Sequence, residues 1–245
     1  LAVQLMVNGY RPVLISTDDY FLSHHKTPRD KFGRFDFESI RAVDIALLNK
    51  HLLAIIKGKK VLLPKFNFIK GRREKGMSVK LPSNGIVMVE GIHCLNEELT
   101  PLVPKNIKFK IYISALTQLN IDDHNRISTT DTRMMRRIVR DTHYRGYTAQ
   151  GVLTQWGRVR TGEEQNIYPF QEEADEMFNS ALIYESAVLK KYCVPLLRKV
   201  EKKDPFYQEA KRLLDYFAYF YDLNDRDVPS NSILREFIGG SSFVY

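Results

Sequence analysis

Apolar and polar residues alternate along the chain in blocks that predict strands and helices in turn. Short apolar runs predict strands at 13–16, 61–63, 85–89, 109–113 and 181–184. Apolar residues at helical spacing predict helices over 39–57, 118–142 and 149–162. Because strands that alternate with helices form parallel sheets covered by those helices, the pattern predicts an α/β fold with a mostly parallel sheet.

The two ends of the chain have patterns of their own. The residues before the first strand have helical spacing and end at the stop signal Asn8–Gly9. Residues 185–245 predict a helical C-terminal extension, in which the stretch 207–223 is too apolar on all sides to be left in water. No repeat or linker-like tract divides the sequence, so we expect a single domain over 1–245, with its α/β core over 1–184.

The composition is that of a basic protein with two cysteines. The formal net charge of +8 favours an anionic partner, and nucleic acid, anionic lipid and phosphorylated small molecules all qualify. Cys94 and Cys193 lack the spacing of a disulfide framework or a metal site. No apolar run approaches the roughly 20 residues that cross a bilayer. We therefore expect a cytoplasmic protein with no membrane partner.

Acidic residues follow two of the predicted strands. Asp18 and Asp19 come after the strand at 13–16, and Glu90 comes after the strand at 85–89. Ligands of open α/β sheets bind outside the carboxyl ends of the strands, so these carboxylates should meet there. One of them could accept a proton from a substrate hydroxyl, and another could hold Mg²⁺. The alternative is that Asp18 and Asp19 only cap the next helix.

Four arginines lie on one stripe of the predicted helix over 118–142. They are Arg133, Arg136, Arg137 and Arg140. Like charges at this spacing repel each other by about 0.2–0.5 kcal/mol per pair, so an anion such as a polyphosphate would stabilise the stripe. Arg145–Gly146 continues the basic run into a turn that could close over a ligand. The alternative is a solvent-exposed face with ion pairs to Asp131 and Asp141.

The segment Gly33–Glu38 combines two carboxylates with two phenylalanines. It could hold a sugar ring by its hydroxyls while the rings exclude water. Alternatively, Asp36 or Glu38 only caps the helix that follows. His24–His25 has no ligand at metal spacing, and the basic residues 70–75 are interpreted as a solvated turn.

The sequence contains no G-x-x-x-x-G-K-[ST] motif, which cradles the β- and γ-phosphates of ATP in P-loop proteins. In those proteins the loop joins a strand to a helix, and the first residues here have helical spacing. We therefore expect this loop and its strand upstream of Leu1.

Five motifs follow one another along the chain. They are Thr17–Phe21, Phe35–Glu38, Glu90–Ile92, Arg136–Asp141 and Arg145–Gly146. In order and spacing they resemble the uridine kinase and phosphoribulokinase family of P-loop kinases over roughly 11–184. The segment 228–241 resembles a uridine kinase-like branch whose members often carry an upstream TGS-type domain. The resemblance implies a three-layer α/β/α fold with an arginine-rich lid near 133–162.

The resemblance also implies ATP-dependent transfer of phosphate to a nucleoside 5′-hydroxyl with Mg²⁺. Asp18 would orient and deprotonate that hydroxyl, and Glu90 and Asp18 would hold Mg²⁺. Arg140 and Arg145 would act on the transferring phosphate. On the substrate side the implied residues are Glu38, Phe21, Phe66 and Arg137. On the nucleotide side they are Arg136, Arg140, Arg145 and Gln155.

The chain departs from the pyrimidine-kinase pattern at three positions. Phe21 and Phe66 stand where those kinases have tyrosines, and Asn67 stands where they have an aspartate. Each lost hydrogen bond removes about 0.5–3 kcal/mol, enough to change the preferred substrate and leave phosphate transfer intact. The acceptor is therefore expected to be nucleoside-like, without a commitment to uridine.

Two alternative functions remain open. The net charge and the arginine stripe suit an RNA- or tRNA-associated binding module, although nucleic acid is the less favoured partner. A catalytically silent nucleotide-binding regulator would also fit the motifs, but the retained Asp18 and Glu90 argue against it. Self-association into a homo-oligomer is left open.

Overall fold

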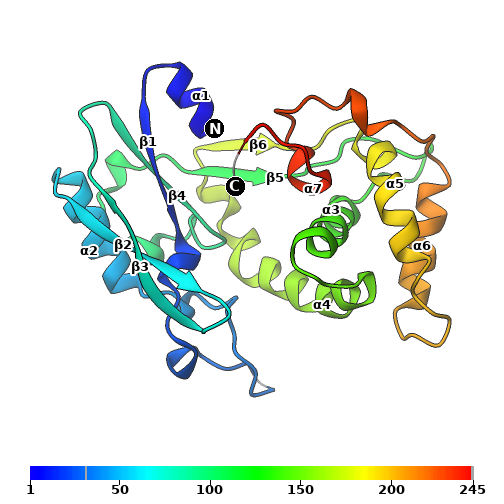
Figure 1. The fold of residues 1–245 in the computed structure, drawn as a ribbon, viewed down its shortest axis with the longest axis horizontal. Coiled ribbons are helices and arrows are strands. Elements are labelled where there is room, and N and C mark those ends of the chain that lie inside the picture. Colours follow the sequence, from blue (N-terminus) through cyan, green and yellow to red (C-terminus); the bar gives the residue numbers. More distant parts are fainter. Residues whose placement is uncertain (31, 244–245) are drawn as a thin grey trace. The chain divides into compact units, whose positions relative to one another are not determined.

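The computed structural model describes residues 1–30 and 32–243, which form two compact units. Unit 1 comprises Leu1–Tyr112 and Thr161–Glu176, and unit 2 comprises Ile113–Arg160 and the chain from Met177 onward. Unit 1 contains α1 (Ala2–Val7), β1 (Arg11–Ser16), α2 (Ile45–Ile56), β2 (Val61–Asn67), β3 (Arg72–Val79) and β4 (Gly85–Glu90) (Figure 1). Unit 2 contains α3 (Thr129–Tyr144), α5 (Glu185–Leu197), α6 (Tyr207–Phe217) and α7 (Arg235–Ile238). The boundary falls within or beside β5 (Ile111–Ser114), α4 (Ala149–Asn166) and β6 (Glu176–Asn179).

Strands β1 and β4 form the parallel pair that the sequence predicts. Their register runs from Arg11 opposite Gly85 to Ser16 opposite Glu90. Both strands therefore end at the same edge, where β1 continues into a single 3-10 turn, η1 (Thr17–Tyr20). The α/β class is confirmed, although the described strands form three two-stranded sheets, β1–β4, β2–β3 and β5–β6, rather than one continuous sheet.

Strands β2 and β3 form an antiparallel hairpin that the sequence only partly predicts. The expected strand at 61–63 continues to Asn67, and the residues expected as a basic turn open β3 at Arg72. The ladder shifts register between Leu62 and Pro64, because proline has no N–H to donate. β3 lacks an apolar face, so its charged residues gave no strand signal.

The core of unit 1 lies between α2 and the two strand pairs. α2 begins at Asp44, whose carboxylate accepts a hydrogen bond from the Leu47 N–H at 3.0 Å. Its apolar face buries Leu48, Leu52 and Ile55, which pack with residues of β1 and β2. This packing fixes η1, at the end of β1, beside β2.

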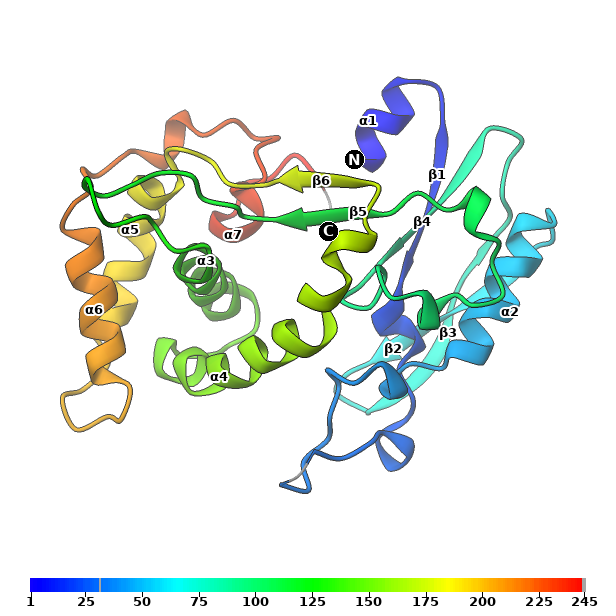
Figure 2. The same ribbon diagram turned by 180° about the vertical axis from the view of Figure 1, so that it is seen from behind.

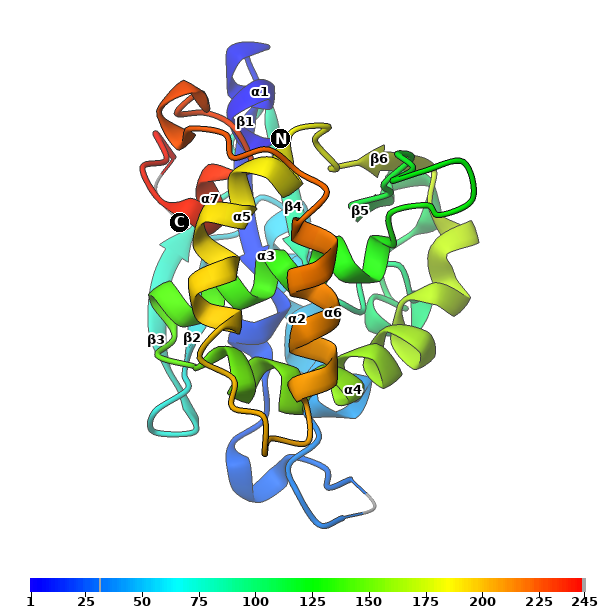
Figure 3. The same cartoon turned by 90° about the vertical axis from the view of Figure 1, so that its right-hand side faces the viewer.

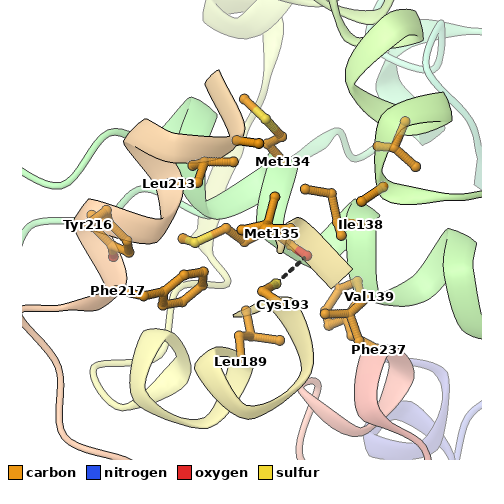
Figure 4. Close-up of a cluster of buried hydrophobic side chains, with 14 of the residues drawn as sticks. Met134, Met135, Ile138, Val139, Leu189, Cys193, Leu213, Tyr216, Phe217 and Phe237 are labelled. Carbon is orange, nitrogen blue, oxygen red and sulfur yellow. Dashed lines mark hydrogen bonds between the residues drawn. The ribbon is translucent and has the colours of Figure 1, made fainter. Parts of the chain in front are cut away.

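The core of unit 2 is built from helices, and Figure 2 shows α3 close to end-on with α5 and α6 to one side of it. Figure 3 shows α5 and α6 side by side, as their contacts require. Met135, Ile138 and Val139 of α3 are fully buried against Leu189 of α5 and Phe217 of α6 (Figure 4). The apolar stretch at 207–223 thus packs on the core, as predicted, through the buried face of α6.

Several predicted elements have different bounds in the structure, and one is absent. α2 begins at Ile45 rather than at 39, and β5 begins at Ile111 rather than at 109. The helix expected over 118–142 begins only at Thr129, because Asp122 accepts hydrogen bonds from the backbone of His124 and Asn125 and holds a turn there. The strand expected at 181–184 is absent, and β6 precedes it. The Glu185 carboxylate instead accepts from the Leu182 N–H at the start of α5. No helix in the described ranges combines the length and apolar character of a membrane span.

Candidate active site

The shared edge of β1 and β4 carries the carboxylates predicted from the sequence. Asp18 lies in η1 and is exposed, and Glu90 is the last residue of β4. Both carboxylates act on the thiol of Cys94: burial, and then the charges of Glu90 and Asp18, together raise its pKa to about 12. Asp18 and Glu90 therefore lie around one point at the carboxyl end of the parallel pair.

The neighbouring Asp19 has a different role. Its Oδ1 accepts a hydrogen bond from the Phe66 N–H at 3.1 Å and lies 3.3 Å from the Lys65 ammonium. These contacts tie η1 to β2 and hold the Asp19 carboxylate away from solvent on one side. Of the two aspartates, Asp18 is the more exposed.

A glycine fixes the distance between the two strand ends. Gly91 follows Glu90 and has φ +151°, and a Cβ there would lie 1.8 Å from Oγ1 of Thr17. No side chain fits at that distance, so the chain after β4 can press against η1 only because this residue is glycine. The close approach keeps Glu90 next to the turn that carries Asp18.

Six aromatic rings form a continuous cluster beside this edge. They are Phe21, His24, Phe35, Phe37, Phe66 and Phe68. Phe21 and Phe66 are buried with ring centroids 5.8 Å apart, whereas Phe68 is exposed. The predicted substrate residues Phe21 and Phe66 are thus brought together, and their shared surface is apolar.

Glu38, the predicted ribose ligand, lies against α4. A Cβ added to Gly162 would be 2.8 Å from Oε2 of Glu38, so glycine is required for this approach. His93 is buried nearby, where burial lowers its pKa while the Glu38 backbone and the Asp36 charge act in the opposite direction. Within the described residues neither ring nitrogen of His93 makes a hydrogen bond, although the Glu38 backbone lies close enough to act on the ring. Sequence reasoning missed His93 because a single histidine carries no spacing signal.

In unit 2 the predicted arginine stripe divides into two groups. Arg136 is buried, donating to Glu185 at 2.6 Å, to the Ser180 hydroxyl at 3.1 Å and to the Ser180 carbonyl at 2.7 Å. Its guanidinium also lies 5.2 Å from the centre of the Phe237 ring. This geometry makes Arg136 part of the unit 2 core, and its contact with the nucleotide stays a prediction.

The other group of arginines surrounds Asp141. Arg137 Nε lies 3.1 Å from one carboxylate oxygen, and Arg140 Nε and Arg145 Nη1 lie 3.0 and 3.4 Å from the other. Asp141 is almost fully buried, whereas the arginines are a quarter to a half exposed. The cluster therefore carries three positive charges and one negative charge, a balance that suits a polyphosphate.

The same aspartate holds the turn after α3. The N–H groups of Arg145 and Tyr147 both donate to the Asp141 carbonyl at 3.1 Å. Asp131, expected as another partner of the stripe, pairs instead with Arg212 at 2.7 Å. The signal for Asp141 was its position four residues after Arg137 and four before Arg145, which places all three on one face.

A comparison with protein-family models decides the family. The model of the phosphoribulokinase / uridine kinase family matches residues 13–183. The chain belongs to this family. Its membership confirms the resemblance and the P-loop kinase class of fold that the motifs predicted.

Relatives from several organisms agree with this assignment. The uridine kinase of Borrelia turicatae is 32% identical over 164 residues, which are 66% of this chain and 71% of the relative. That of Clostridium novyi is 32% identical over 165 residues, with 66% and 70% covered. That of Halobacterium salinarum is 26% identical over 168 residues, with 68% and 67% covered. A crystal structure of a kinase from Silicibacter sp. aligns with a TM-score of 0.48 at 14% identity, covering 72% of this chain and 79% of that chain.

Membership of this kinase family implies the use of ATP and Mg²⁺, and the chemical types of the residues present suit both. Mg²⁺ is usually held by one or two carboxylates together with water and phosphate, which matches Asp18 and Glu90. The described residues contain no cluster of three or more histidine, cysteine or acidic side chains that would form a complete protein cage. Gln155, the predicted lid residue, is half-buried on α4.

Proposed function

We propose that the protein is a Mg²⁺- and ATP-dependent kinase that phosphorylates a hydroxyl of a nucleoside or a related small metabolite. Family membership supports the reaction class. The observation that carries the proposal is the pair of exposed carboxylates at one strand edge: Asp18 in η1 and Glu90 at the end of β4, whose charges both act on Cys94. Asp18 is the proposed chemical group, whereas the neighbouring Asp19 accepts the Phe66 N–H and supports the turn.

In the proposed reaction Asp18 accepts the proton of the acceptor hydroxyl as the hydroxyl oxygen attacks the γ-phosphorus. The bond from that phosphorus to the β,γ-bridging oxygen breaks, and ADP leaves. General base catalysis of this kind contributes about 10²- to 10⁴-fold to a rate. Glu90 and Asp18 provide the carboxylate oxygens for Mg²⁺. The ion, when bound, neutralises charge on the phosphates. The turn at Gly91 keeps these two carboxylates at one strand edge.

In unit 2 the proposed phosphate ligands are Arg140 and Arg145, with Arg137 on the acceptor side. Asp141 holds Arg137 and Arg140 through their Nε atoms, so the outer N–H groups of each guanidinium point away from that contact. Guanidiniums fixed in this way stabilise charge on a phosphate without having to reorganise.

The acceptor side is proposed to be more apolar than in a kinase that reads a pyrimidine by hydrogen bonds. Phe21 and Phe66 meet edge to face, with an interplanar angle of 86°, and neither carries a hydroxyl. Glu38 is the proposed ligand for a sugar hydroxyl. A nucleoside or another polyol with a flat apolar portion would suit these residues.

The test is transfer of labelled phosphate from ATP and Mg²⁺ to a panel of nucleosides and polyols by the full-length protein. Asp18→Asn is expected to lower kcat by about 10²- to 10⁴-fold. Asp123→Asn, an exposed aspartate in unit 2, is the matched control and should retain full activity. Retention of activity by Asp18→Asn would remove Asp18 as the base.

The same assay separates the two alternative functions. A silent regulator would bind ATP and form no product with any acceptor. An RNA-binding module would form no product and would lose RNA affinity steeply with added salt. The structure weakens the basis of that second reading, because Arg136 is buried and three other arginines share one carboxylate.

A further inference from the structure

The segment Asn224–Gly240, called here the C-terminal segment, is closed into a compact loop by one side chain. The guanidinium of Arg235 donates to the carbonyls of Val228 at 2.5 and 3.1 Å, Asp225 at 2.7 Å and Gly239 at 3.4 Å. A planar guanidinium can hold three carbonyls at once because its N–H groups form a rigid fork. Arg235 therefore determines the course of this segment.

The C-terminal segment is anchored to α5. The Asp225 carboxylate accepts from the Lys191 ammonium at 2.7 Å and from the Tyr192 hydroxyl. The bond from Lys191, and then the one from Tyr192, lower the pKa of Asp225 to about 2. The beginning of the segment is thus fixed to a helix of the unit 2 core.

The end of the segment packs on α3. Phe237 of α7 is buried in the unit 2 core, where Figure 4 shows it beside Val139 of α3. Its ring also lies 5.2 Å from the Arg136 guanidinium. These contacts place α7 along the part of α3 that carries the arginines.

The segment then meets the last residue of α3. Gly239 has φ +86°, and a Cβ there would lie 3.2 Å from the Tyr144 hydroxyl. Tyr144 ends α3 and directly precedes Arg145. On the neighbouring side the His143 ring lies 5.7 Å from that of Tyr192, which anchors the segment. The last turn of α3 is therefore supported by the C-terminal segment and its anchor.

The turn that follows α3 has little other support. Gly146 has φ +70°, and no heavy atom of the described residues outside its immediate chain neighbours lies within 4 Å of the position its Cβ would take. The turn is held chiefly by the two amides that donate to the Asp141 carbonyl. Its geometry thus depends on the last turn of α3 staying in place.

We propose that the C-terminal segment positions the arginine cluster of Arg137, Arg140 and Arg145, with Arg235 as the positioning residue. The inference rests on the proposed function, in which these arginines bind phosphate. Loosening the segment frees the end of α3, so Asp141 no longer aligns the guanidiniums. The effect should therefore fall mainly on ATP, the proposed ligand of Arg140 and Arg145, and less on the acceptor, for which Arg137 is the one proposed ligand in this cluster.

The test compares Arg235→Met with Arg198→Met, an exposed arginine on the C-terminal side of α5. Misplacement of catalytic groups by about 1 Å costs about 10²-fold, so we expect Arg235→Met to lower kcat/KM for ATP by about 10- to 100-fold. KM for the acceptor, which is proposed to contact only Arg137 of the cluster, should rise less than KM for ATP. Arg235→Lys, which keeps the charge without the fork, should restore little of the loss.

A second measurement is independent of activity. Hydrogen exchange of residues 140–147 reports the two amides bonded to Asp141, and it should accelerate in Arg235→Met but not in Arg198→Met. Gly239→Ala should act in the same direction, with Gly9→Ala as control, because Gly9 has a similar φ of +85° and nothing near its Cβ position.

The outcomes separate this inference from the proposed function. If the wild-type protein phosphorylates no acceptor, the kinase proposal fails, and exchange at 140–147 still decides whether the segment positions the turn. Unchanged exchange in both Arg235→Met and Gly239→Ala would overturn the inference. Equal decreases of kcat/KM for ATP and for the acceptor would also overturn the inference, because equal decreases would indicate general destabilisation.

Discussion

Two adjacent aspartates at the end of β1 differ in exposure and in the roles proposed for them. Asp19 accepts the Phe66 N–H at 3.1 Å, so its removal leaves a backbone donor of β2 without its partner. Asp18 is exposed, and its substitution by asparagine keeps the shape of η1. The two side chains have the same chemistry and differ in exposure, since Asp18 is exposed and Asp19 is half-buried.

We therefore expect Asp19→Ala to lower the free energy of unfolding by about 1–3 kcal/mol, because the partly buried Phe66 N–H loses its acceptor. Asp18→Asn should change it by about 0.5 kcal/mol or less. Urea denaturation of both variants measures this difference. Equal losses would mean that Asp18 also supports the fold.

At the scale of elements, the parallel pair and the turns that follow it determine where the carboxylates lie. The register places Ser16 opposite Glu90, so η1 and the Gly91 turn leave the sheet together. Thr17 is buried between them, and its hydroxyl occupies the space in which a side chain at position 91 would stand. The two turns are packed as one structure.

Gly91→Ala should therefore destabilise the protein by about 3 kcal/mol or more, since a Cβ 1.8 Å from the Thr17 hydroxyl forces the turns apart. Thr17→Ala removes that hydroxyl and should recover part of the loss in the double variant. A double-mutant cycle from thermal or urea unfolding gives the coupling. Simple additivity of the two losses would contradict the close approach.

The elements also show how far the sequence could predict the structure. Strands with apolar runs, such as β1 and β4, and the buried face of α6 were found, because burial leaves a periodic pattern. β3 was missed because neither of its faces is apolar, so its sequence shows no alternation of apolar and polar residues. The arginine stripe was seen, but helical spacing alone could not show that Arg136 turns inward to Glu185, since that depends on a residue 49 positions away.

At the scale of the whole molecule, the two units contain different titrating groups. Burial lowers the pKa of His93 and His51, both in unit 1. Hydrogen bonds from Lys108 and then Lys110 lower the pKa of Glu97, also in unit 1, to about 2. Hydrogen bonds from Lys191 and then Tyr192 lower the pKa of Asp225, in unit 2, to about 2. Acid should therefore act on the two units in different pH ranges.

The direction of each pKa shift determines the pH range in which the group loses its contribution to stability. A histidine with a lowered pKa binds fewer protons in the folded state than in the unfolded state. Its contribution to the free energy of unfolding is therefore complete above about pH 6.5 and decreases as the pH falls. The carboxylates keep their contribution down to about pH 4.5 and lose it towards pH 2. We expect unit 1 to lose hydrogen-exchange protection first, between about pH 6.5 and 5.

The control for this response is His93→Gln, which removes one of the two titrating histidines. Its loss of protection in unit 1 between about pH 6.5 and 5 should be smaller than that of the wild type, relative to its own value at pH 7.5. Protection in unit 2 should not distinguish the two proteins in this range. An identical pH dependence in both would show that His93 does not titrate as its burial requires.

The thiol between the two carboxylates has a practical consequence for labelling. With its pKa raised to about 12, Cys94 is almost entirely protonated at neutral pH, and the buried Cys193 has its pKa raised further still. Maleimides and similar reagents react with the thiolate, so both native cysteines should be nearly inert. A cysteine introduced at the exposed Tyr147 would then be the one reactive thiol, and a fluorophore attached there would follow the arginine turn without removal of either native cysteine.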